Sequence, residues 1–275
     1  MFTFIDSIDD LATLNKELLN KPYVAIDTEF RRTTKDNMKL ALLQINDNEE
    51  IYLVDTIFIK DPKEHCSFLF SEKVTKILHS FKEDLEAILA WTDKCMINIF
   101  DTQLANAFLD SEFSISYQGL VEKKLDIILD KNETRSNWIR RPLTDSQLKY
   151  ASLDVEYLIH IYEEQITHLS KTEKLDWMNE DINKIIFTAI SPPQDNLELK
   201  RKISKDREDS ILFMFNSSIE EISKNENINS TLFFSKKAQK DFIRLVFLKD
   251  IDFALGSITS WRARLIKDDL QNILS

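Results

Sequence analysis

The sequence predicts an α/β fold in which helices flank a mixed β-sheet, and two observations lead to this prediction. Three short apolar runs, Tyr23–Phe30, Leu40–Asn46 and Glu50–Asp55, come early and are separated by turn residues, as expected for strands of an antiparallel meander. A fourth short run, Thr75–His79, is followed by segments with helical periodicity. Strands that come first and helices that alternate afterwards are typical of a layered α/β domain with a mixed sheet.

Helices are predicted from apolar residues that recur every three to four positions. The predicted helices of this part are 6–20, 82–90, 102–109, 117–125 and 144–169. Two of them begin with the pattern of a capping box, formed by Ser80 with Glu83 and by Thr144 with Gln147. The last is the strongest helix prediction, because Pro142 precedes its capping box.

A second domain is predicted after the run Ser191–Asn196, which breaks all periodicity. We therefore expect one domain over residues 1–194 and a small helical domain over residues 195–275. A chain of 275 residues is long enough to bury one good core and to leave material for a second, smaller one.

Composition excludes several classes of protein. A hydrophobic content of 43% with 30% charged residues is ordinary for a globular protein, and two cysteines are too few for a disulfide framework. The first ten residues carry acids and no bases, unlike a signal peptide, and no apolar run reaches membrane-spanning length. A cytoplasmic protein without membrane partners is the expectation. The net charge of −11 argues against binding nucleic acid by overall charge, although local basic clusters are present.

Acidic residues stand at positions where several elements end or begin. Asp27 and Glu29 end the first apolar run, and because alternate residues of a strand share a face, both point to one spot. Asp84 falls in the first turn of a helix, and Tyr150 lies four residues before Asp154 on a shared helix face. Each feature alone has an ordinary explanation, such as a solvated strand end or a favourable helix dipole. Together they indicate an oxygen-only site suited to Mg²⁺ or Mn²⁺.

The order and spacing of these residues resemble the three motifs of the DEDD 3′–5′ exonuclease superfamily. A tyrosine four residues before the last acid marks its DEDDy branch. Within that branch the chain resembles ribonuclease D over roughly residues 1–190. The segments that carry this resemblance are 27–30, 42–44, 79–86, 100–105, 131–144 and 150–158. The part after residue 195 has room for one helicase-and-ribonuclease-D C-terminal domain, where the family typically carries two.

The resemblance implies a ribonuclease-H-like sheet and two divalent cations, Mg²⁺ or Mn²⁺. It implies that Asp27 bridges both ions, that Glu29 and Asp154 complete one, and that Asp84 serves the other. Tyr150 would orient the attacking water, since a phenol with a pKa near 10 is neutral at about pH 7. The residues expected to contact the substrate are Thr28, Phe30, Gln44, His79 and Arg135.

The expected function is therefore that of a metal-dependent exoribonuclease, which releases nucleoside 5′-monophosphates from single-stranded RNA 3′ ends. By resemblance, the expected substrates are transfer-RNA precursors and the expected state is a monomer. Two alternatives stay open at this point. The acids do not read a 2′-hydroxyl, so DNA could be the substrate, and a non-catalytic RNA-binding scaffold could keep the same fold.

Overall fold

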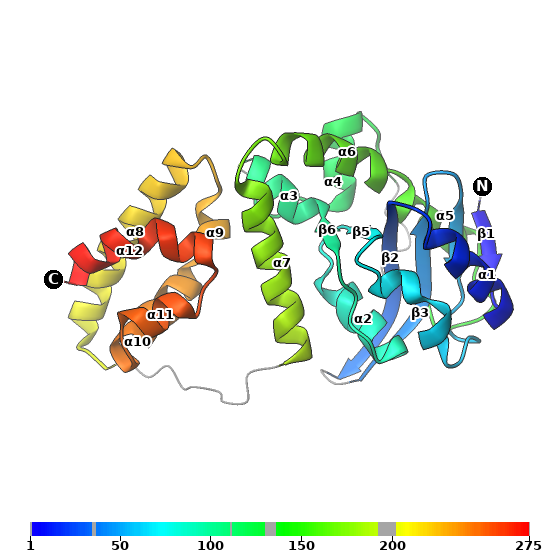
Figure 1. Ribbon diagram of the computed structural model, residues 1–275, viewed down its shortest axis with the longest axis horizontal. Coiled ribbons are helices and arrows are strands. Elements are labelled where there is room, and N and C mark those ends of the chain that lie inside the picture. The colour runs from blue at the N-terminus through cyan, green and yellow to red at the C-terminus, as the bar shows by residue number, and fades with distance from the viewer. Residues whose placement is uncertain (1, 35–36, 111, 130–135, 192–201, 275) are drawn as a thin grey trace.

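A computed structural model provides the structure of the chain (Figure 1). It describes residues 2–34, 37–110, 112–129, 136–191 and 202–274. The described residues form one six-stranded sheet in the order β1-β4-β3-β2-β5-β6. The strands are β1 Phe2–Ile5, β2 Tyr23–Thr34, β3 Asn37–Asn46, β4 Ile51–Val54, β5 Thr75–Leu78 and β6 Ile99–Asp101.

The sheet is mixed, which confirms the predicted fold class. Strands β2, β3 and β4 form the expected antiparallel meander, whereas β5 and β6 run parallel to β2, and β1 runs parallel to β4. The sequence did not reveal β1 and β6, because four and three residues are too few to show a period.

Helices cover both faces of this sheet. Their bounds are α1 Ile8–Leu18, α2 Lys82–Thr92, α3 Thr102–Leu109, α4 Tyr117–Leu125, α5 Asp145–Glu156 and α6 Leu158–Leu169, with short 3₁₀ turns at Pro62–His65 and Ser67–Phe70. Val24 and Ile26 of β2 share an apolar cluster with α1 and α2, whereas Ala25 between them packs with α4 and α6. Helix α5 packs on β2, β3 and β4 on the same side as α6. Alternation along β2 therefore directs Asp27 and Glu29 towards α5.

The segment predicted as one helix over residues 144–169 is two helices, because it is interrupted at Tyr157. The Tyr157 N–H donates to Tyr117 Oη (3.2 Å), and that hydroxyl donates to the Leu153 carbonyl (3.0 Å). A continuous helix would pair this N–H with this carbonyl. The apolar period runs on across the interruption, so the sequence alone gives no sign of it. The predicted capping box of Thr144 and Gln147 is confirmed.

The capping box predicted for Ser80 and Glu83 is wrong. Ser80 has a positive φ of 66° and lies before Phe81, which is the N-cap residue of α2. The Phe81 N–H donates instead to Asp101 Oδ2 (2.8 Å), while Asp101 Oδ1 accepts from the Leu104 N–H (2.8 Å) in α3. The buried Asp101 carboxylate thus binds the start of both α2 and α3. At α2 it takes the place of the predicted local cap.

Helix α7, Lys174–Ile190, stands between the sheet and a group of C-terminal helices (Figure 1). That group consists of α8 Lys205–Asn225, α9 Ser230–Phe233, α10 Lys236–Leu248, α11 Ile251–Gly256 and α12 Ser260–Leu274. The predicted boundary between residues 194 and 195 lies outside the described residues, so the division into two domains stays a prediction. In the part of the chain that the structure describes, no helix is long and apolar enough to cross a membrane.

A buried ion pair attaches the C-terminal helices to α7. The Arg262 guanidinium of α12 pairs with both carboxylate oxygens of Asp181, with Nη2 2.9 Å from Oδ2. Trp261 Nε1 donates to Asp181 Oδ1 (3.2 Å), and the Trp261 ring stacks on Trp177, with centroids 4.9 Å apart. Because Asp181 is only 7% exposed, loss of one partner would leave a charge that water cannot fully solvate.

We expect Asp181→Ala to lower the free energy of unfolding by about 3 kcal/mol, since it leaves Arg262 without its counter-ion. Urea unfolding followed by far-UV circular dichroism measures this change. The control is Glu173→Ala, which removes the ion pair between Glu173, the N-cap residue of α7, and Arg264 of α12. Both of these side chains are more than half exposed. This control should cost less than about 1 kcal/mol. If both variants lose the same free energy of unfolding, the buried Asp181–Arg262 pair is not the main polar attachment between α7 and α12.

Candidate active site

Three of the predicted acids meet on the face of the sheet that α5 covers. Asp27 and Glu29 follow the buried part of β2, and Asp154 lies in the last turn of α5. One carboxylate oxygen from each lies within 4.8 Å of the others. A strand and a helix that are distant in the chain thus direct three hard oxygen donors to one point.

The fourth acid, Asp84, lies in the first turn of α2 and is 7% exposed. Asp84 Oδ1 accepts a hydrogen bond from Thr28 Oγ1 at 2.5 Å. Thr28 stands between Asp27 and Glu29 and points to the opposite face, so its side chain links α2 to the strand. Its hydroxyl is therefore used inside the protein, which leaves only its backbone for the predicted substrate contact.

A β-bulge shapes β3 beside these acids. The pairing partners of Glu29 and Phe30 are separated by one extra residue, Ala41. Bulges bend a strand and redirect its side chains, and they often occur next to active sites. Arg141 Nη2 donates to the Ala41 carbonyl (2.7 Å), and the Arg141 guanidinium also forms an ion pair with Asp55 after β4 (Nη2–Oδ1 2.7 Å). In the sequence Arg141 falls in a basic cluster and in one of the segments that resemble ribonuclease D, but neither feature indicated this contact.

The four acids are crowded, and Asp84 is buried while the other three are half-buried. Burial, and then the charge of Asp27, raises the pKa of Glu29 to about 10, and burial raises the pKa of Asp154 to about 7. The pKa of Asp27 is raised by burial and Asp154, and the pKa of Asp84 by burial and Asp27. No lysine or arginine of the described residues forms an ion pair with any of them. Divalent cations would relieve this repulsion, and a set of carboxylate oxygens suits Mg²⁺ or Mn²⁺.

Tyr150 lies one helical turn before Asp154, as the spacing predicts. The ring centroids of Tyr150 and Trp138 lie 6.1 Å apart. Trp138 belongs to a loop whose carbonyl at this residue accepts a hydrogen bond from Arg141 Nη1. A cavity of about 310 Å³ lies between this loop and the part of β2 that follows Glu29. Its lining residues are Phe30, Arg31, Ser136, Asn137, Trp138 and Ile139.

Two of the residues predicted to contact substrate are at least half-buried in the protein. Gln44 is fully buried, and its amide has no hydrogen-bond partner among the described residues. His79 uses both ring nitrogens, towards Thr102 Oγ1 (2.9 Å) and the Ile115 carbonyl (3.0 Å), and burial lowers its pKa. Sequence position could not show this burial, because the residues that surround Gln44 and His79 come from distant segments. Arg135 lies outside the described residues.

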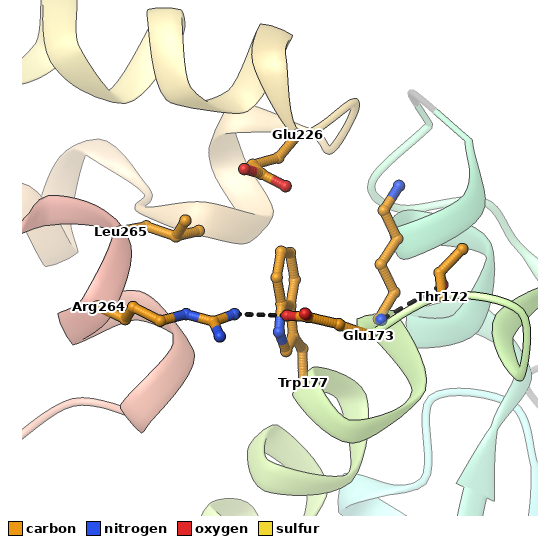
Figure 2. A pocket seen from close by; sticks show the side chains of 7 residues that line it. Thr172, Glu173, Trp177, Glu226, Arg264 and Leu265 are labelled. Carbon is orange, nitrogen blue, oxygen red and sulfur yellow. Dashed lines mark hydrogen bonds and ion pairs between the residues drawn. The ribbon is translucent and has the colours of Figure 1, made fainter.

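A separate cavity of about 510 Å³ lies between α7 and the C-terminal helices (Figure 2). Figure 2 shows Arg264 reaching across it to Glu173, beside the ring of Trp177. Of the described residues that line this cavity, none belongs to the predicted site. We therefore place the candidate active site at the carboxylates.

A mixed sheet that brings together four acids, two from a strand and two from helix ends, is typical of the ribonuclease-H-like class of nucleases. Comparison with known proteins narrows this class. A family model described as 3′-5′ exonuclease matches residues 2–168, and the chain belongs to this family. Members of this family are metal-dependent, in agreement with the carboxylate cluster.

Individual relatives point in the same direction. The chain is 40% identical to ribonuclease D of Pseudomonas paraeruginosa over 171 residues. This alignment covers 62% of this chain and 45% of that protein. It spans about half the length of the curated relatives it matches. The fold is similar to that of Escherichia coli RNase D, with a TM-score of 0.68 at 23% identity over 99% of this chain and 74% of that chain. It is also similar to Brucella melitensis NrnC with bound Mg²⁺, with a TM-score of 0.57 at 18% identity over 72% of this chain and 96% of that chain.

The raised pKa of Asp154 predicts how stability depends on pH when no cation is present. The native carboxyl titrates at about 7 and an unfolded one near 3.9, so the native state binds more protons between these values. The metal-free protein therefore loses stability as the pH rises through this window. In a chelator, the melting temperature of Asp154→Asn minus that of the unsubstituted protein should therefore increase as the pH is raised from about 5 to about 8.

At about pH 8, added Mn²⁺ should make the unsubstituted protein more stable than Asp154→Asn, because only the unsubstituted protein keeps all four carboxylate ligands. Differential scanning fluorimetry with chelator or Mn²⁺ measures both effects. The control is Asp145→Asn, which removes an exposed acid from the same helix and should show neither trend. If the two melting temperatures differ by the same amount at all pH values and Mn²⁺ changes neither, Asp154 is not part of a metal-binding carboxylate cluster.

Proposed function

We propose that this chain is a metal-dependent 3′–5′ exoribonuclease that releases nucleoside 5′-monophosphates from RNA 3′ ends. The observation that carries the proposal is the meeting of Asp27, Glu29 and Asp154 within 4.8 Å, with Asp84 held beside them by Thr28. Membership of the 3′-5′ exonuclease family and likeness to ribonuclease D support it.

Two divalent cations fit the donor set better than one, because four carboxylates offer more ligands and more charge than one ion would balance. Asp27 would be shared, Glu29 and Asp154 would hold one ion, and Asp84 would hold the other. When bound, such ions supply Lewis-acid activation of water and stabilise charge on the attacking and leaving oxygens.

The reaction is the hydrolysis of the last phosphodiester. The oxygen of a water molecule attacks phosphorus in line with the bond from phosphorus to the 3′ oxygen of the preceding nucleotide. That bond breaks, the 3′ oxygen takes a proton, and the terminal nucleotide leaves as a 5′-monophosphate. The Tyr150 hydroxyl orients the water by a hydrogen bond and remains protonated, since a phenol is a weak base at neutral pH.

The cavity of about 310 Å³ beside Glu29 would receive nucleotides near the 3′ end. Phe30 offers an apolar ring for stacking, which tolerates any base. Arg31 forms no ion pair within the described part of the chain, so its charge is available to a phosphate. The Thr28 backbone directly follows Asp27 and would contact the terminal 3′ hydroxyl. Arg135, Arg140 and the basic run 200–207 would extend the track for a single strand.

We further propose transfer-RNA precursors as substrates, a monomeric state and a cytoplasmic location, in keeping with the resemblance to ribonuclease D. Residues 195–275 would form a separate helical domain of the helicase-and-ribonuclease-D C-terminal type. Its attachment through α7 would keep it in a constant position beside the nuclease part.

The direct test uses purified protein, a labelled single-stranded RNA, and Mn²⁺ or a chelator. We expect stepwise shortening from the 3′ end with release of nucleoside 5′-monophosphates, in Mn²⁺ only. Asp154→Asn should reduce the rate by about three orders of magnitude, because a ligand to the activating cation is lost. A DNA oligonucleotide of the same sequence is the comparison, and equal degradation of DNA would remove the preference for RNA. Undegraded RNA in Mn²⁺ would refute the proposal.

The role of Tyr150 can be tested separately. We expect Tyr150→Phe to lower kcat by about 100-fold, because the water loses the group that orients it. The Mn²⁺-induced shift in melting temperature should stay the same, since Tyr150 supplies no charged ligand. Tyr157→Phe, which removes a hydroxyl three residues after Asp154, is the control and should be as active as the unsubstituted protein. Weakened Mn²⁺ binding in Tyr150→Phe would instead place its hydroxyl among the ligands.

A further inference from the structure

The backbone on both sides of Asp154 is held by side chains from other elements. The Leu153 carbonyl accepts from Tyr117 Oη of α4, and the same hydroxyl accepts from the Tyr157 N–H. The Val155 and Glu156 carbonyls accept from Asn46 Nδ2 of β3 at 3.0 and 3.3 Å. These contacts form the joint between α5 and α6, and Asp154 lies inside it.

Tyr117 is itself firmly placed. It is 7% exposed, and its ring centroid lies 5.9 Å from that of His79. His79 is fixed in turn by Thr102 and by the Ile115 carbonyl, just before α4 begins. Asn46 is 8% exposed, and its Oδ1 accepts from the Asn48 N–H (2.8 Å), which orients its amide towards the joint.

We propose that Tyr117 and Asn46 are positioning residues for Asp154, an inference that rests on the proposed function of the carboxylates. Without the hydroxyl, the Leu153 carbonyl and the Tyr157 N–H would pair directly or stay unpaired. A direct pair would rewind the joint and turn Asp154 away from Asp27. An unpaired joint would leave the carboxylate loosely placed. Displacement of a catalytic group by about 1 Å can cost 100-fold in rate.

The test is Tyr117→Phe, which keeps the ring and removes only the hydroxyl. We expect a folded protein in which kcat falls by about 10-fold and half-saturation requires about 10-fold more Mn²⁺, the usual effect of losing a group that orients a metal ligand. KM for RNA should change less than 2-fold, because the contacts to the strand lie elsewhere, and excess Mn²⁺ should restore part of kcat. Isothermal titration with Mn²⁺ alone measures the same loss of affinity without any turnover.

The matched control is Tyr23→Phe, which removes a hydroxyl bonded to Glu163 on the surface (2.8 Å) and should leave all these values unchanged. If Tyr117→Phe equals this control in kcat and in Mn²⁺ affinity, the inference is wrong. If the unsubstituted protein degrades no RNA, the proposed function fails, and the Mn²⁺ titration alone decides on Tyr117. If Tyr117→Phe does not fold, Asn46→Ala takes its place, and unchanged Mn²⁺ affinity in that variant overturns the inference.

Discussion

Mutual repulsion of four carboxylates is the constraint on which the rest of this structure depends. Asp27, Glu29, Asp84 and Asp154 are largely shielded from water, no basic residue of the described chain pairs with them, and their pKa values are raised. A fold that forces like charges together must hold each one against the tendency to separate. Protons or divalent cations can neutralise the cluster.

The elements that carry the acids are fixed by contacts that cross the sheet. Thr28 ties the start of α2 to β2, and Asp101 fixes the same turn to α3. Arg141 binds the carbonyl of the bulge at Ala41 and holds the loop of Trp138. The Tyr117 hydroxyl completes the joint beside Asp154. Each is a polar group that is buried or half-buried and has its hydrogen-bond partners, so each specifies one arrangement among the many that apolar packing alone would allow.

The periodic features of the chain could be predicted from the sequence. The meander, the bounds of α3 and α4 and the capping box at Thr144 follow from local patterns, and Tyr150 and Asp154 fall on one helix face as expected. Features that depend on distant partners could not be predicted. The cap of α2 comes from Asp101, the interruption at Tyr157 depends on Tyr117, and the bulge at Ala41 is visible only in the pairing of β2 with β3. Gln44 and His79 resemble substrate contacts in the sequence, yet Gln44 is fully buried and both ring nitrogens of His79 bind other parts of the protein.

The ion pair of Asp181 with Arg262 has a consequence for how such a chain can diversify. It joins the C-terminal helices to one side of α7, whereas the carboxylates lie on β2, α2 and α5. Changes in these helices could therefore leave the positions of the four carboxylates unaltered. The surface that meets other molecules could in this way vary independently of the carboxylate site.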